Sequence, residues 1–195
     1  MMVISLNNDL TVINDISETL KMLVENNISE LPPNSVVFDS PADIQKSNKS
    51  GLSLFLYQIS ENADLKNQDM VDIGSNQIQS PPLALDLHYL LTPYAQTRQT
   101  EQIIMSKLVR TFHDNSIVND SLLRNSLREV GNKELHIIFN TVPLEQINNL
   151  WSTFHDTPYK LSVSYLVTPI LIPSDIIAET TRVLSKQSSF VNKQG

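Results

Sequence analysis

Four histidines are the side chains of this sequence best suited to metal binding or acid–base catalysis: His88, His113, His136 and His155. The short spacings that mark many zinc sites, HxxxH and HExxH, are absent from the chain. His113 and His155 each precede an aspartate at a predicted helix end, where imidazole stabilises the last carbonyls and aspartate suits the following turn. We therefore favour a structural role for the histidines and expect no metal ligand among them.

Other catalytic and cofactor-binding patterns are missing as well. The chain has no cysteine, which excludes thiol nucleophiles, disulfides and cysteine-ligated zinc or iron–sulfur sites. Its four glycines form no GxGxxG or Walker-type loop, and no serine lies in a GxSxG motif. Asp86, on a predicted strand, is either a buried acid or, as we favour, a carboxylate at a polar edge or paired with a cation. We expect no catalytic residue, no cofactor-binding residue and no cofactor, although a triad assembled from distant residues stays open.

Charge and hydropathy limit the partners of the chain. It has 14 lysines and arginines against 21 aspartates and glutamates, a formal net charge of −7, and its cations are scattered. A phosphate-binding face needs clustered cations, so we expect no nucleic-acid partner. The longest apolar stretch, residues 165–172, is too short to span a bilayer, and residues 1–10 lack the features of a signal peptide. We expect a soluble protein with no membrane partner that begins in the cytoplasm.

Hydrophobic periodicity predicts a single α/β (α+β) domain with a mixed β-sheet flanked by helices. The predicted strands are residues 35–39, 52–59, 83–91, 135–139 and 161–172. The predicted helices are a first one capped by Asn8 or Asp9 and ending near Asn27, then residues 98–112, 121–130 stopped by Gly131, and 143–154 opened by Pro143. With 41% hydrophobic residues, the chain can fold around its own core without a metal or disulfide.

The remaining segments are predicted to be irregular. Residues 41–50 form a polar loop, and residues 60–80, rich in Asn, Gln, Asp and Ser, form a long connecting loop. We divide the chain into a domain over 1–172 and a C-terminal extension over 173–195, which contains a marginal helix and is partly disordered or becomes ordered on assembly.

Two sequence patterns occur twice. Tyr89–Pro93 (YLLTP) resembles Tyr165–Pro169 (YLVTP), and Thr111–Asp114 is identical to Thr153–Asp156 (TFHD). Their order along the chain reverses, so they are not a tandem repeat. Either similar turn chemistry recurs at element boundaries, which we favour, or the sheet is pseudo-symmetric with two equivalent strands.

The single tryptophan, Trp151, has two interpretations. Tryptophan is enriched at the centres of protein interfaces, so it is a candidate anchor for a partner. It also continues the apolar stripe of the predicted helix that begins at Pro143, and we favour packing in the core.

Three segments carry a resemblance to a known family: LSLFLY at 52–57, PLALDLHYLLTP at 82–93, and LWSTFHDTPYKLSVSY at 150–165. They resemble the cap, or tail-terminator, proteins of phage-tail-like extracellular contractile injection systems of the antifeeding-prophage and Photorhabdus virulence cassette type. The resemblance runs from about Asp9 to Ile172. Some members of that family carry a further C-terminal domain, which we do not find in this sequence.

The resemblance implies a non-enzymatic structural protein that forms an oligomeric ring, with a hexamer expected. Such a cap sits on the last layer of sheath and inner-tube subunits, ends their polymerisation and seals the particle. It assembles in the cytoplasm and then stays in a particle that is released or remains intracellular.

Sheath subunits of these machines exchange strands, and we expect residues 35–39 to be the edge that accepts such an arm. We expect residues 60–80 and the tail after Pro173 to become ordered in the ring. The alternatives are a tube-end or baseplate adaptor, or a small hydrolase with an unrecognised triad or a His/Asp metal site.

Overall fold

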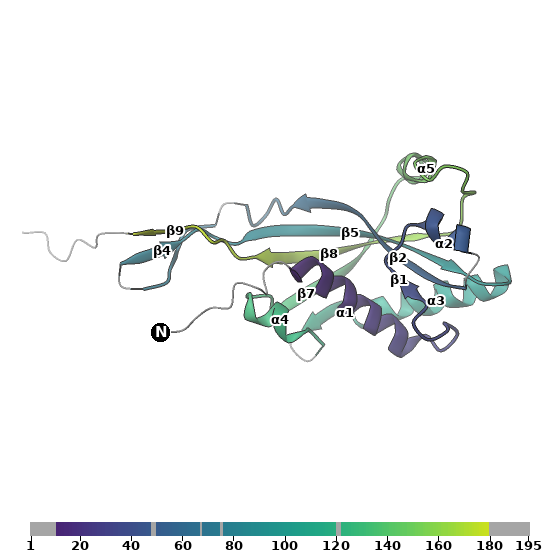
Figure 1. The fold of residues 1–195 in the computed structure, drawn as a ribbon, viewed down its shortest axis with the longest axis horizontal. Coiled ribbons are helices and arrows are strands. Elements are labelled where there is room, and N and C mark those ends of the chain that lie inside the picture. The colour runs from purple at the N-terminus through teal and green to yellow at the C-terminus, as the bar shows by residue number, and fades with distance from the viewer. Residues whose placement is uncertain (1–10, 48–49, 67, 75, 120–121, 180–195) are drawn as a thin grey trace, which may run out of the picture.

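The computed structural model describes residues 11–47, 50–66, 68–74, 76–119 and 122–179, which form two β-sheets and five helices (Figure 1). The main sheet has six strands in the order β1-β2-β5-β8-β7-β6, and a smaller sheet has the order β3-β4-β9. The strands are β1 (Val36–Val37), β2 (Gly51–Glu61), β3 (Val71–Asp72), β4 (Gln77–Gln79), β5 (Leu83–Tyr94), β6 (Ile117–Asn119), β7 (Glu134–Asn140), β8 (Val163–Ile172) and β9 (Ile177–Glu179). β1 runs parallel to β2 and the other neighbours are antiparallel, so the predicted mixed sheet is confirmed.

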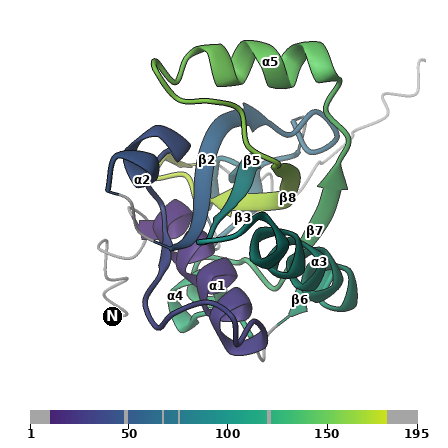
Figure 2. The same cartoon turned by 90° about the vertical axis from the view of Figure 1, so that its right-hand side faces the viewer.

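The helices are α1 (Val12–Asn27), α2 (Pro41–Ser47), α3 (Arg98–Asp114), α4 (Asn125–Glu129) and α5 (Leu144–Ser152). α1, α3 and α4 cover one face of the main sheet, α5 crosses the other face, and α2 lies beside β2 (Figure 2). None of the helices in the described ranges is long and apolar enough to cross a membrane.

The core forms where the alternating side chains of β5 meet the apolar stripes of α1 and α3. Leu87, Tyr89 and Leu91 are fully buried on this face, whereas Leu90 points to the other face and packs with α5. The Tyr89 hydroxyl lies 2.8 Å from the Ser17 hydroxyl of α1, and burial raises the pKa of Tyr89 to about 12. β2 is covered on both faces, as predicted, from Gly51 to about Tyr57, whereas Gln58 and Ile59 further along the strand are exposed.

The prediction of a polar loop over 41–50 is wrong for its first part, because α2 begins at Pro41. Ser40 precedes the helix, and its hydroxyl lies 2.6 Å from the Asp43 carboxylate and 3.4 Å from the Asp43 amide. Proline suits a first helical turn, and Ile44 is buried against the body. The signal is a serine cap followed by proline, which a count of polar residues hides.

The prediction of a long loop over 60–80 is also wrong in part. β2 continues to Glu61, and β3 and β4 pair as a short hairpin within that segment. After Pro173 the chain forms strand β9 over residues 177–179 instead of the predicted helix, and β9 pairs with β4. Residues 180–195, including the predicted disorder over 186–195, and the predicted cap residues Asn8 and Asp9 lie outside the described residues.

Several strand and helix boundaries differ from the predicted ones for physical reasons. β5 continues through Pro93, where β8 has ended and only β2 remains as a neighbour, so the missing proline N–H interrupts no inner ladder. α4 covers only residues 125–129, and Gly131 follows with a φ of +98°, in the left-handed region that suits the predicted helix stop. β6 was not predicted, since three residues carry little periodicity.

The repeated patterns have two different origins. Tyr89 and Tyr165 are direct cross-strand partners in the antiparallel β5–β8 pair, so the two YLxTP segments run outward in opposite directions from one point. Phe112, from the first TFHD segment, packs on the face covered by α3, whereas Phe154 packs on the face covered by α5. The pseudo-symmetric interpretation therefore fits the two strands, and recurring turn chemistry fits the helix ends.

Candidate interaction surfaces

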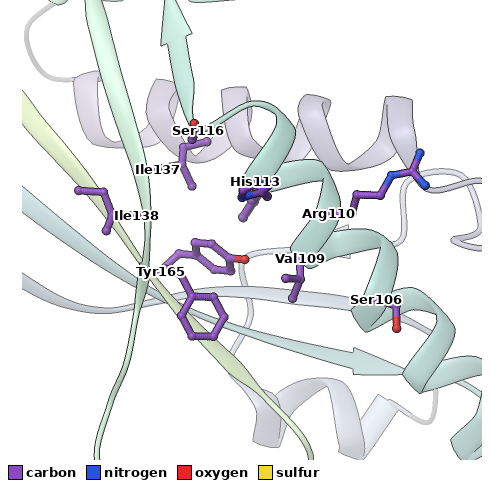
Figure 3. A pocket seen from close by; sticks show the side chains of 10 residues that line it. Ser106, Val109, Arg110, His113, Ser116, Ile137, Ile138 and Tyr165 are labelled. Atoms are coloured by element: carbon purple, nitrogen blue, oxygen red, sulfur yellow. The ribbon is translucent and has the colours of Figure 1, made fainter.

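An apolar hollow lies between α3 and β7, and we name it the α3–β7 groove. β7 is longer than β6, whose pairing ends at Ile117 opposite His136, so no strand of the described residues lies on the outer side of residues 138–140. The hollow has a volume of about 770 Å³. It is lined by Ser106, Val109, Arg110, Phe112, His113, Ser116, Ile137, Ile138, Phe139 and Tyr165, and several of these converge on the space between helix and strand (Figure 3).

Three aromatic rings form the floor of the groove. Tyr165 stands edge-on to Phe112, with ring centroids 4.8 Å apart, and to Phe139, with centroids 5.3 Å apart. Burial raises the pKa of Tyr165 to about 12, in keeping with the apolar surroundings of its hydroxyl. Half of the Phe139 side chain is exposed, which leaves apolar surface open to a partner.

The rim of the groove on α3 carries the guanidinium of Arg110 and the imidazole of His113. The Arg110 side chain is largely exposed, and its Nε lies 3.6 Å from Asp114, one turn further along the helix. His113 belongs to the last turn of α3 and lines the groove. The next cation along the helix, Lys107, is paired with Glu30 of the α1–β1 connection. The groove thus offers an apolar floor beside Arg110 and His113.

The small sheet projects from the body, and we name residues 62–82 and 173–179 the finger (Figure 1). Its β4–β9 pair continues the line of β5 and β8, and Pro81, Pro82 and Pro173 lie at the junction, where they lack the N–H that a ladder needs. The finger exposes large apolar side chains with exposed fractions of 43% to 68%: Met70, Val71, Ile73, Ile176 and Ile177. It also carries five acidic residues and a single lysine.

The predicted accepting edge, residues 35–39, lies at the edge of the main sheet. Only Val36 and Val37 form β1, however, and the Val36 side chain is fully buried. The sequence did not indicate the opposite edge of the sheet, made by β6 and the free end of β7, as a candidate interaction surface. That edge exposes more apolar surface than β1 does, through Ile117, Ile138 and Phe139.

The predicted core position of Trp151 is confirmed. It is 5% exposed and stands edge-on to Phe154 and Tyr159, with ring centroids 5.5 and 5.3 Å away. Trp151 is nevertheless the one fully buried residue of α5 among those described, and Leu144 at the start of the helix is mostly exposed. α5 is therefore attached to the sheet by its C-terminal end.

Two carboxylates tie the helices to the body. Burial alone would raise the pKa of Asp15 in α1, but hydrogen bonds from Ser126, Thr11 and Arg124 hold it below its ordinary value. The pKa of Glu101, in the first turn of α3, is also held below its ordinary value. Burial alone would raise this pKa, but the hydrogen bond from Lys160 and further donors outweigh that effect. These ties fix α1 and α3 in place.

The histidines lie at separate places in the structure. His113 and His155 are exposed near helix ends, and His136 Nε2 lies 3.0 Å from the Glu134 carboxylate. Within the described ranges, no group of three or more histidine, aspartate or glutamate side chains could hold a metal ion.

One serine–histidine contact was not predicted. Ser60 Oγ lies 3.3 Å from His88 Nε2, across the β2–β5 pair, and His88 Nδ1 is buried without a partner. The nearby Asp86 is half-buried and accepts hydrogen bonds from Asn62 and Thr168 instead. Of the two environments that we favoured for Asp86, the structure therefore shows polar neighbours and not a cation. The pair therefore lacks the orienting carboxylate of a catalytic triad.

Comparison with known proteins gives a family and a fold. The model of a family described as the Pvc16 N-terminal domain matches residues 15–186. A cryo-EM structure of an extracellular contractile injection system, the PVC sheath/tube terminator in the extended state, is 18% identical with a TM-score of 0.66, covering 94% of this chain and 64% of that chain. The cryo-EM structure of the anti-feeding prophage cap, the AFP tube terminating cap, is 20% identical with a TM-score of 0.63, covering 91% and 61%.

No curated protein matches the chain. This chain spans less than two thirds of the length of either solved structure, and at this identity the likeness establishes the fold. The predicted fold, a mixed sheet flanked by helices of the tail-terminator kind, is confirmed.

Proposed function

Because this chain belongs to the family of the Pvc16 N-terminal domain, we propose that it is a tail terminator of a contractile injection system. As a structural cap, it ends the polymerisation of the inner tube and of the contractile sheath. The observation that carries the proposal is the family match over residues 15–186, supported by a fold similar to that of two terminator proteins. The chain assembles in the cytoplasm and remains at the end of the particle.

The surfaces of the molecule suit this role. A terminator must bind its own copies sideways and the last tube and sheath subunits below, so it needs unlike surfaces on one chain. The α3–β7 groove, the finger and the β1 edge are three such surfaces, formed by different elements. We propose a ring of six copies in which the β1 edge accepts an extended sheath arm through main-chain hydrogen bonds.

The Ser60–His88 contact is the one observation that favours a hydrolase instead. Its histidine lacks an orienting carboxylate, so we propose that the contact is structural and that the protein is not an enzyme. Ser60→Ala then leaves capping unchanged, whereas loss of capping with an intact fold would support a catalytic role.

The capping proposal is tested with purified tube subunits that elongate in solution. Adding the chain is expected to stop elongation, with the protein bound at tube ends in electron micrographs and not along the walls. Native mass spectrometry of the bound fraction gives the number of copies. Tubes that elongate at an unchanged rate with the chain in saturating excess, and without end-bound protein, would contradict the proposal. The same assay with sheath subunits tests the second partner.

A further inference from the structure

The finger has too little structure to be stable on its own. Its strands contain two or three residues each, and its apolar side chains Met70, Val71 and Ile177 are exposed at about half of their surface or more. A small sheet needs a hydrophobic face packed on something to hold its shape in water. The finger therefore requires a cover from outside the described body.

Its own body does not provide that cover. The finger leaves the N-terminal end of β5, whereas α3 follows the C-terminal end of the same strand, so the finger projects away from the helices (Figure 1). The prolines at the junction, Pro81, Pro82 and Pro173, interrupt the hydrogen bonding between the two sheets. No described residue of the body therefore covers the finger, and the occupant that we consider is a second copy of this chain.

The α3–β7 groove has the complementary properties. Its floor of Phe112, Phe139 and Tyr165 is apolar, and its rim carries Arg110 and His113. The finger combines exposed isoleucine, valine and methionine with five acidic residues against one lysine. An apolar acidic projection and an apolar hollow with the exposed guanidinium of Arg110 at its rim match in hydropathy, and Arg110 offers the acidic residues a partner in exchange for its long contact with Asp114.

The two main chains are complementary as well. The free end of β7 at residues 138–140 has no outer neighbour strand in the part of the chain that the structure describes, and both β3 and β9 are edge strands of the small sheet there. An edge strand of the finger can thus add main-chain hydrogen bonds to the burial of its side chains.

We infer that the finger of one copy docks into the α3–β7 groove of the next copy, which makes this contact the ring interface of the terminator. Because finger and groove are different surfaces, the contact is heterologous, and repetition around an axis closes a ring. The inference rests on the proposed terminator function and names the surfaces that would form its ring.

Two exposed positions allow each half to be disabled separately. Ile177→Glu places a charge on the apolar surface of the finger, and Phe139→Glu places one on the floor of the groove, where Phe139 contacts Tyr165 on the face covered by α3. Both side chains are about half-exposed in the monomer, so both variants should fold. Each is expected to weaken self-association by on the order of tenfold or more. Leu144→Glu on α5, outside both surfaces, is the matched control and should associate as the unmodified protein does.

Mixing the two variants gives the sharpest result. The Phe139→Glu copy keeps an intact finger and the Ile177→Glu copy keeps an intact groove, so the mixture should form a dimer and no ring in native mass spectrometry, while each variant alone stays monomeric. Circular dichroism and thermal unfolding check that both are folded. A ring formed by either folded variant alone, or a mixture that stays monomeric, would overturn the inference.

The outcomes separate this inference from the proposed function. If the unmodified chain forms rings and caps tubes while Ile177→Glu does the same, only the finger–groove contact is wrong. If the unmodified chain neither forms rings nor binds tube ends, the terminator function fails together with the contact.

Discussion

The two ends of the long β5–β8 ribbon contrast in how their apolar residues are used. In the body, Leu87, Tyr89 and Val167 are fully or almost fully buried beneath α1 and α3. Beyond the prolines, the continuing β4–β9 pair belongs to a finger whose residues of the same kinds, such as Val71 and Ile177, are half-exposed. Similar residue types thus make a core at one end and an open surface at the other, depending on whether helices cover the strands.

This contrast separates stability from assembly. The body buries enough apolar surface to fold without a partner, whereas the finger gains a cover only through contact with another chain. Substitutions in the body should therefore change the free energy of unfolding, and substitutions in the finger or groove should change association.

The largest expected effect tests the buried end of the ribbon. Leu87→Ala removes a fully buried side chain from the centre of the core and should lower the free energy of unfolding by about 2–5 kcal/mol. Leu83→Ala, near the finger on the same strand and about half-exposed, should change it by less than about 0.5 kcal/mol. Urea unfolding of both variants measures the two free energies. If Leu83→Ala lowers the free energy of unfolding as much as Leu87→Ala does, the two ends of the ribbon do not differ in their contribution to stability.

A smaller effect, dependent on pH, tests the tie between α1 and α4. Asp15→Asn keeps the shape of the side chain but removes the charge that accepts hydrogen bonds from Arg124 and Ser126, so it should cost about 1–3 kcal/mol at pH 7. Because the folded pKa of Asp15 is lowered, its contribution is present above the unfolded value of about 3.9 and is lost as the pH falls through the folded value.

Urea unfolding at several pH values checks this sign. The gap between the unmodified protein and the Asp15→Asn variant should be largest near neutral pH and shrink in acid. Asp114→Asn, an exposed carboxylate beside Arg110, is the control and should change stability by less than about 0.5 kcal/mol. A gap that stays constant down to acid pH would contradict the assigned role of the Asp15 charge.

Hydrogen exchange compares the two ends of the ribbon directly. Amides of β4 and β9 should exchange fast in the monomer, because their local opening costs little free energy. The opening free energy of amides at the centre of β5 should approach the global free energy of unfolding. In assembled rings the finger amides should become protected and the β5 amides should change little. Protection of the finger in the monomer would show that it needs no partner.

The smallest stability effect is expected at the groove rim. Arg110→Ala removes an exposed side chain whose contact with Asp114 is long, so the melting temperature should stay almost unchanged. Association should nevertheless weaken and lose part of its salt dependence, because a cation opposite the acidic finger is gone. If the Arg110→Ala variant and the unmodified protein associate equally well at low salt, the charge of Arg110 does not contribute to the contact.

The sequence predicted the elements whose periodicity is local. The alternation over Leu83–Leu91 and the stripe of α3 placed β5 and its covering helix correctly, because each pattern is complete within one segment. The resemblance gave the family, which the match over residues 15–186 confirms. What failed were short elements, α2, β6 and β9, whose few residues carry little pattern.

The surfaces were harder to predict because each combines distant segments. The groove floor takes Phe112 from α3, Phe139 from β7 and Tyr165 from β8, and no spacing within the chain indicates that they meet. The contact between Ser60 and His88 depends on a register shift between Leu56 and Gln58, which the alternation of β2 does not reveal. In the finger, β4 and β9 pair residues about a hundred positions apart.

The central claim is that this chain ends polymerisation, and particle length measures that most directly. In cells that produce the particle, deleting the gene for this chain should replace a narrow length distribution in electron micrographs with a broad one, and tubes without a terminal ring. Supplying the unmodified chain, or its Leu144→Glu variant, should restore both the length and the ring. Particles of unchanged length with a normal terminal ring in the absence of this chain would contradict the account.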